Sequence, residues 1–420
     1  MNHSKKIDTL LYIWYIVFLG SMICSFRAIS SIATALILVT GLFQNKIDTG
    51  TWFSIRLKNK FLAACFLFYA IVILSLLYTG NYYESAKHLQ TQSAVFLVPF
   101  AICCSSHPGA DACKKLKKYF IWMLAAVLFF CLLKAGYKYF YLHTDNTVFF
   151  YHALVSPFQQ HAVLVSLYTF IALVYLLDNA ATGIDFYNKR LHFLMIIYLI
   201  CCILLLSSKL VISFSVCSLI YYCFLFLKVK LFKRVAIYAA LFTGLLIILA
   251  VVSTQNKIGN RFNEIASGNL AIVEQPKFSP AVYFNGLQFR LLQWRFVNEI
   301  LTEEHAWLTG VADSAQLLLN KKYISTHMYT GDSNFGTRGY LGYNAHNQFL
   351  QSLLQAGIAG LGSFLLISLT LVSLAIQKQS RLLAIVTAIL IAWCFNESIF
   401  EIQYGIMLFT FFPLFLARSI

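Results

Sequence analysis

Charged residues are scarce in this chain. Only 11% of its 420 residues are Asp, Glu, Lys or Arg and 60% are hydrophobic, whereas a soluble domain has roughly 25% charged residues. So few charges cannot cover the surface of a soluble protein of this length. Apolar runs such as Phe61–Tyr78, Leu210–Leu227 and Gly357–Ala375 approach the ~20 residues that span the hydrocarbon core of a bilayer. The composition therefore predicts a membrane protein.

Acidic residues are scarcer still, with 16 Asp and Glu against 32 Lys and Arg. The resulting net charge of +16 does not indicate a nucleic-acid partner, because the basic residues are scattered between apolar runs and form no basic domain. Membrane proteins acquire such a balance from their cytoplasmic loops.

Cysteine pairs with the spacing of a redox or metal motif are missing. The 11 cysteines include no Cys-x-x-Cys, nearly all lie in or beside apolar runs, and none occurs between Cys223 and Cys394. We therefore expect free thiols that pack as small hydrophobes.

A cleavable signal peptide is not indicated either. Lys5 and Lys6 precede the first apolar run, but no small-residue cleavage site follows it.

The apolar runs predict an all-α polytopic membrane protein with about 12 transmembrane helices. The runs are 10–26, 28–43, 61–78, 93–105, 119–133, 161–177, 191–206, 210–227, 235–252, 357–376, 382–396 and 399–417. If the N-terminus is inside, the inner segments hold 19 Lys and Arg and the short outer loops hold five. This bias predicts that both termini are cytoplasmic.

One long connection interrupts the pattern of short loops. About 90 residues, from Ser253 to Ala345, separate the ninth and tenth runs and are predicted to lie outside. A long loop without low complexity is usually functional. We expect three parts: helices one to nine over residues 1–252, an outer loop with short helices over 253–345, and helices ten to twelve over 346–420.

The most specific pattern opens the third part: His346, Asn347, nine residues, Gly357, two residues and Gly360. A continuous helix from His346 to Ile376 would be ~46 Å long at 1.5 Å per residue, which exceeds the ~30 Å hydrocarbon core. His346 is then expected at the outer boundary, with both glycines near its face for close helix packing. On helix geometry alone, an interfacial histidine above a packing face is the favoured interpretation.

This pattern resembles the signature of the O-antigen ligase family. Other features fit as well: the preceding outer loop, the Arg290-Leu-Leu-Gln-Trp294 segment within it, and a closing segment, 396–405, similar to Bacteroidetes-type members. The resemblance is specific in the C-terminal half and rests on hydropathy in the N-terminal half. It implies a GT-C-like fold in the bacterial inner membrane, with the active site on the periplasmic side.

The family resemblance also implies the reaction. The donor is a glycan on undecaprenyl pyrophosphate, and the acceptor is lipid A–core in ligases or a second lipid-linked glycan in polymerases. The family is regarded as needing no metal, no ATP and no cofactor. The sequence agrees, since its outer loop lacks Asp-x-Asp and the chain lacks a Walker-type loop.

A metal-free reaction needs cations that hold the diphosphate, and Arg290 is our first candidate. On a helix, Trp294 at i+4 is placed to stack on Arg290, whereas Arg295 points elsewhere and is expected on a solvated face. Lys209 is a second candidate, at a position where family members often have Arg; Lys lacks the bidentate geometry. Arg338 is either a third cation or a loop charge.

His346 suits a general base, because the neutral imidazole accepts a proton near pH 7. Asn347 is expected to orient its ring or a sugar hydroxyl. Glu397 and Glu401, at i and i+4, are rival bases or partners for an active-site Arg or for His346, since an unpaired carboxylate there is costly. His161 is a further substrate-binding candidate, and His152, on the same outer segment, is weighed with it; a structural role is the alternative for both.

Two other classes of function compete with the transferase. A lipid-linked oligosaccharide flippase or another transporter would place charged residues along a path within the helices, whereas the distinctive polar residues here gather at one face. A non-catalytic assembly subunit would have no use for the His346 pattern. Within the family, the ligase is favoured and the polymerase remains the alternative.

Overall fold

The computed structural model describes residues 2–52, 60–75, 77, 82–105, 110–182, 188–227, 244, 269–332 and 338–418. Within these ranges every regular element is a helix. The α-helices are α1 (Asn2–Ile23), α2 (Arg27–Thr49), α3 (Lys60–Ser75), α4 (Tyr82–Gln92), α5 (Ala94–Cys104), α6 (Ala110–Tyr141), α7 (Tyr151–Val155), α8 (Ala162–Thr182), α9 (Lys189–Leu206), α10 (Lys209–Leu227), α13 (Gly286–Glu303), α14 (Ala315–Ser325), α15 (Gln348–Gln377), α16 (Arg381–Cys394) and α17 (Gln403–Ala417). Each predicted apolar run falls on one of these helices, except the ninth, 235–252, which apart from residue 244 lies outside the described residues.

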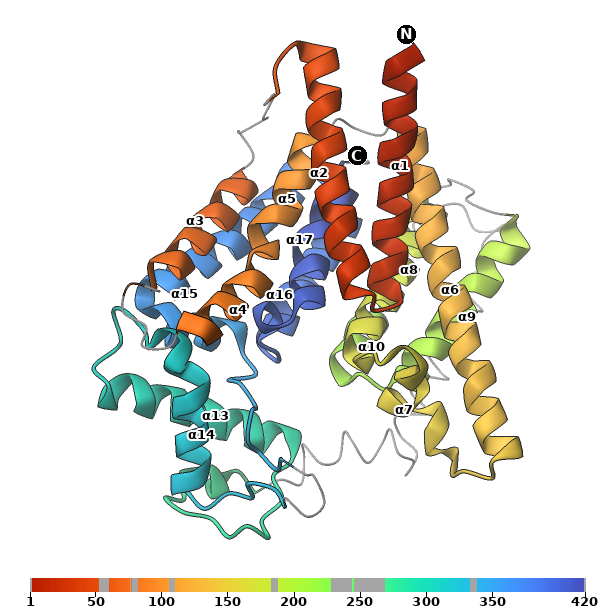
Figure 1. Ribbon diagram of the computed structural model, residues 1–420. Coiled ribbons are helices and arrows are strands. Elements are labelled where there is room, and N and C mark those ends of the chain that lie inside the picture. Colours follow the sequence, from red (N-terminus) through yellow and green to blue (C-terminus); the bar gives the residue numbers. More distant parts are fainter. Residues whose placement is uncertain are drawn as a thin grey trace.

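Six of the helices are long and apolar enough to cross a membrane: α1, α2, α6, α8, α9 and α15. Shorter apolar helices, α3, α10, α16 and α17, pack beside them. The predicted class, an all-helical polytopic membrane protein, is confirmed in this form, while a total of about 12 spans stays a prediction. Both chain termini lie at one end of the bundle, and α13 and α14 lie at the other (Figure 1).

Helix α8 forms the centre of one half of the bundle. It packs against α6, α7, α9, α10 and α16, and 16 of its 21 residues are buried. A helix that is hydrophobic on all sides can be stable only where other helices surround it.

All 11 cysteines are free, as predicted.

The described part of the long connection folds as a small helical unit, which we call the loop unit (residues 269–332 and 338–345). Asn285 starts α13 with a capping box: its side chain accepts from the backbone N–H of Leu287 and Gln288, and Gln288 Oε1 accepts from the Asn285 N–H. The apolar face of α13 then packs against α14 and the first turns of α15, with Phe296, Leu319 and Leu354 in one buried cluster. The loop unit thus has its own core.

Helix α15 corrects the prediction of one continuous helix from His346. It begins at Gln348 and breaks at Ala356–Gly357, where Gly357 adopts φ +63° and ψ −156°. This backbone region is essentially restricted to glycine. Leu353 and Leu354, before the break, pack with the loop unit, whereas Phe364 and Ile367, after it, belong to the core of the bundle. Gly357 and Gly360 therefore do not share a helical face with His346.

The backbone of residues 307–311 fills the break in α15. Ile358 N–H donates to Trp307 O at 3.0 Å, and Val311 N–H donates to Leu354 O at 2.8 Å. A Cβ atom on Gly357 would lie 2.1 Å from Leu308 O. The Ile358 N–H and the Leu354 carbonyl, which would pair with each other in a continuous helix, thus find partners in residues 307–311. The predicted close approach at Gly357 is real, but its partner is a loop and not a helix.

Candidate active site

His346 and Glu397 form the centre of the candidate site. His346 Nδ1 lies 2.8 Å from Glu397 Oε2, and the two side chains are 20% and 21% exposed. An ionised carboxylate only accepts hydrogen bonds, so the imidazole donates through Nδ1, and in the neutral ring Nε2 is left as the acceptor. His346 itself adopts a left-handed φ of +44° just before α15, and its backbone N–H donates to Asn344 Oδ1.

Arg290 binds the same carboxylate from α13. Its Nη2 lies 3.2 Å from Glu397 Oε1, its Nε donates to Asn396 O at 3.0 Å, and its Nη1 donates to Gly286 O at 2.9 Å. A guanidinium has five N–H groups, so these contacts leave two for a ligand. Glu397 therefore joins the loop unit to His346 through one carboxylate.

Hydrogen bonds from backbone N–H groups to side chains hold the start of α15 and the connection between α16 and α17 together. Asn347 N–H donates to Ser398 Oγ at 3.2 Å, and Phe400 N–H donates to Gln348 Oε1 at 2.7 Å. The connection between α16 and α17 is thereby fastened along the start of α15. The Asn347 side chain accepts from the backbone N–H of Phe349 and Leu350, so it caps α15. Its predicted contact with the ring of His346 is not what the structure has.

The local charges keep Glu397 ionised. Burial alone would raise the pKa of Glu397, but the hydrogen bond and charge of His346 and the charge of Arg290 lower the pKa below its ordinary value.

His161, which precedes α8, is close enough to interact electrostatically with both His346 and Glu397. Desolvation lowers the pKa of His161, Glu397 opposes this shift, and His346 adds to it. The ring of His152 lies 4.6 Å from that of His161.

Glu401 belongs to a different cluster. It ends a 3₁₀ turn, η8 (Ile399–Glu401), and its Oε2 lies 2.8 Å from His88 Nε2 of α4. Because α16 ends at Cys394 and α17 begins at Gln403, Glu397 and Glu401 do not sit on one helical face. The predicted i, i+4 pair is therefore two carboxylates with separate partners.

The remaining candidate residues lie in the following places. Trp294 is on α13, but in the described part of the chain no cation–π contact joins it to Arg290, and its indole Nε1 is buried without a hydrogen-bond partner. The predicted stacking is thus wrong, because Arg290 turns toward Glu397.

Lys209 is the first residue of α10, and Arg338 is exposed in the loop unit. Arg295, expected on a solvated face, instead binds Glu299 and the backbone of Gln275.

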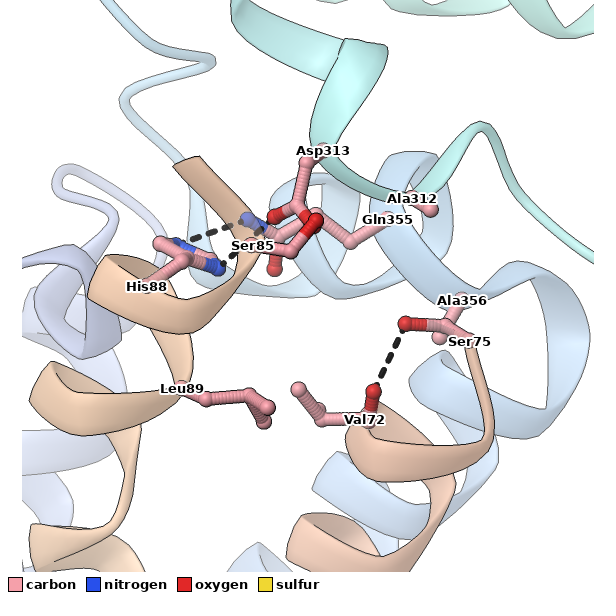
Figure 2. Close-up of a pocket in the computed structure, with 9 residues that line it drawn as sticks. All are labelled: Val72, Ser75, Ser85, His88, Leu89, Ala312, Asp313, Gln355 and Ala356. Atoms are coloured by element: carbon pink, nitrogen blue, oxygen red, sulfur yellow. Dashed lines mark hydrogen bonds and ion pairs between the residues drawn. The ribbon is translucent and has the colours of Figure 1, made fainter. Parts of the chain in front are cut away.

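Sequence reasoning missed three polar residues: His88, Asp313 and Gln355. They come from α4, the turn η6 (Ala312–Ser314) and the end of the first part of α15, and Figure 2 shows them turned toward one another. The one available signal was Glu401, since a carboxylate within an apolar run is costly unless it is paired. Nothing in the spacing identifies which of the ten histidines provides it.

No group of three or more His, Cys, Asp and Glu side chains arranged to hold a metal ion occurs among the described residues. The polar atoms that are available in the site are Nε2 of His346, the outer N–H groups of Arg290 and the ring of His161. Together they supply a proton acceptor beside a cation, a combination suited to activating a hydroxyl group next to an anionic leaving group.

Fold and site together define a polytopic helical membrane protein with a His–Glu–Arg cluster between its loop unit and its last helices. Residues 193–365 match the family model described as O-antigen ligase, so the predicted resemblance is confirmed for this part of the chain. The match includes Arg290, His346 and Gly357, whereas Glu397 and His88 lie outside it. No curated protein matches the chain.

Proposed function

We propose that this protein transfers a glycan from undecaprenyl pyrophosphate to lipid A–core at the periplasmic face of the bacterial inner membrane. The observation that carries the proposal is the contact of Glu397 with both His346 and Arg290. An imidazole and a guanidinium that contact one carboxylate support a reaction with a base and a cation, and the match of residues 193–365 to the O-antigen ligase model supports glycan transfer. Both termini are cytoplasmic in this proposal.

The proposed reaction needs one proton transfer and one displacement. Nε2 of His346 takes the proton of the acceptor hydroxyl, and the hydroxyl oxygen forms a bond to the anomeric carbon of the donor. The bond between that carbon and the pyrophosphate oxygen breaks, and the electron pair leaves with undecaprenyl pyrophosphate. Glu397 stabilises the imidazolium that forms, as a buried carboxylate does in other His-based sites.

Arg290 is proposed to stabilise the leaving diphosphate. Its two unused N–H groups offer charge-assisted hydrogen bonds at the point where negative charge develops. Lys209, Arg338, Trp294 and His161 are proposed to bind the donor or the acceptor around this centre. Membrane lipids surround the helices, and the scheme uses no cofactor.

Purified protein in vesicles, with lipid-linked donor and lipid A–core acceptor, tests the proposal. We expect glycan to move onto lipid A–core, and we expect His346→Gln to lower the rate of transfer ~10²-fold or more. Transfer only onto a second lipid-linked glycan would assign the polymerase reaction instead. Movement of the donor across the bilayer without any new glycosidic bond would contradict the transferase and indicate a flippase.

A further inference from the structure

A second cluster of polar side chains lies beside the site, around His88 of α4. His88 Nε2 is 2.8 Å from Glu401 Oε2, and His88 Nδ1 is 3.5 Å from Asp313 Oδ1 of the loop unit. Gln355 Nε2 donates to Glu401 Oε1 at 2.8 Å. A small cavity borders this cluster, and Figure 2 shows His88, Ser85, Asp313 and Gln355 around it.

The cluster needs all of its members to be stable. Glu401 is 18% exposed and Asp313 is 12% exposed, and a buried carboxylate is costly unless it is paired and hydrogen-bonded. His88 is the basic side chain in contact with both carboxylates. Burial would lower the pKa of His88, but Glu401 and Asp313 raise it to about 9, so the imidazole is a cation at neutral pH.

The His88 cluster and the His346 cluster share two chain segments. Glu397 and Glu401 begin and end the same short connection, 397–401. Gln348 and Gln355 reach that connection from α15, and Gln351, which also binds Glu401, accepts from the N–H of Ala345. His88 thus binds the 397–401 connection at Glu401, and His346 and Arg290 bind it at Glu397.

The loop unit reaches the same place. Residues 307–311 fill the break in α15, and Asp313 follows directly in η6. His88 therefore lies where α4, the loop unit and the 397–401 connection meet. It is not part of the reacting centre, since its two ring nitrogens face Glu401 and Asp313.

We propose that His88 is a positioning residue for the His346–Glu397 pair, and that it acts by fixing Glu401 and with it the 397–401 connection. This role rests on the proposed transferase function. A cation at position 88 holds Glu401, Glu401 holds the connection, and the connection presents Glu397 to Nδ1 of His346. An unpaired Glu401 would instead turn toward water and carry the connection with it.

Substitution in pairs separates positioning from a direct role in catalysis. His88→Gln leaves Glu401 as an uncompensated carboxylate, and we expect kcat to fall roughly 10-fold or more with little change in KM for the donor. His88→Gln combined with Glu401→Gln replaces the ion pair by two neutral amides and should restore much of the lost kcat. Lys87→Gln is the matched control, because it removes one positive charge from an exposed position of the same helix.

A double-mutant cycle tests whether His88 acts through Glu397. If it does, His88→Gln should add little to the loss caused by Glu397→Gln, because the contact that it supports is already absent. Independent losses that multiply would contradict the proposal. So would a double variant, His88→Gln with Glu401→Gln, that is no better than His88→Gln alone.

A spectroscopic measurement makes the test independent of glycan transfer. In protein labelled with ¹⁵N-histidine in micelles, the His346 signal is identified by its loss in His346→Gln. We expect a fixed Nδ1–H tautomer in the native protein, exchange between tautomers in His88→Gln, and a fixed tautomer again in the paired variant. An unchanged His346 signal in folded His88→Gln would overturn the positioning role, even if the protein transfers no glycan. A protein with the expected spectra but no transfer would contradict only the proposed function.

Discussion

Nδ1 of His346 lies 2.8 Å from Oε2 of Glu397, and the same carboxylate binds Arg290 through its other oxygen at 3.2 Å. His346 and Glu397 are 51 positions apart in the chain. Because Nδ1 is engaged, proton transfer is left to Nε2. The histidine, its partner and the cation thus come from three separate elements, and each can be changed alone.

His346 is the first residue to test. We expect His346→Gln to lower kcat by ~10²-fold or more, in the range of general-base contributions. His346→Asn is the better-matched variant, since asparagine adopts the left-handed backbone of this position (φ +44°) more readily than most residues. Both rates are measured in vesicles with lipid-linked donor and purified acceptor.

The control for His346 is His327→Gln. His327 is also left-handed (φ +60°) and is exposed in the loop unit, so its substitution should leave the rate unchanged. Near-normal turnover by both His346 variants would remove this histidine from the mechanism. The proton acceptor would then have to be sought at His161, the neighbouring imidazole.

Arg290 and Arg295 offer a matched pair on one helix. Arg290→Lys keeps the charge but cannot maintain three bonds to Glu397, Asn396 and Gly286 together, so we expect a loss of roughly 10²-fold in kcat. Arg295→Lys should retain turnover and lower only the stability of the loop unit, because Arg295 binds Glu299 and Gln275. Rates and thermal unfolding midpoints are measured on the same preparations, and equal losses of kcat would show that Arg290 has no special role.

Gly357 tests the break in α15. Gly357→Ala places a Cβ atom against Leu308 O in a backbone conformation that costs other residues about 1–3 kcal/mol. We expect a lower unfolding midpoint and less folded protein, with normal kcat in the fraction that folds. Gly362→Ala, on the same helix with open space at its Cβ, is the control and should behave as wild type. A wild-type midpoint for Gly357→Ala would mean that the helix runs straight.

The apolar runs identified the helices because the length of a bilayer-spanning helix is fixed by the membrane. They did not reveal the break in α15, since Leu350, Leu353 and Gly357 continue a helical pattern through it. What decides the break is a tertiary contact, the backbone of residues 307–311.

The candidate site was predictable only in part, because its contacts are also tertiary. His346 and Arg290 lie in recognisable patterns, whereas their common partner Glu397 was one of two carboxylates that the sequence could not separate.

His88 shows the limit of sequence reasoning more clearly. It lies on α4, a short polar helix between apolar runs, and nothing near it in the chain resembles a site. Its partners, Glu401 and Asp313, are 313 and 225 positions away by residue number. Only the folded chain brings them together, because α4 contacts both η6 and η8.

The orientation of the chain in the membrane is tested by cysteine labelling in a background without native cysteines. Leu317→Cys lies at an exposed position of α14, and Gln379→Cys lies in the exposed turn between α15 and α16. From the distribution of basic residues, we expect an impermeant maleimide to label the first in intact spheroplasts and the second only after lysis. The reverse pattern would place the loop unit in the cytoplasm and exclude a periplasmic active site.

The His88–Glu401 pair predicts how stability depends on pH. The pKa of His88 is raised from 6.5 to about 9, so its contribution to the free energy of unfolding is complete below pH 6.5 and is lost as the pH rises through about 9. The pKa of Glu401 is lowered from 4.5, chiefly because His88 outweighs the effect of burial, so its contribution is lost only in acid. Unfolding midpoints of the native protein and of His88→Gln should therefore differ most near pH 6.5 and converge as the pH rises above 9. A difference that stays constant from pH 6 to 10 would mean that His88 is neutral in the folded protein and that hydrogen bonding alone holds Glu401.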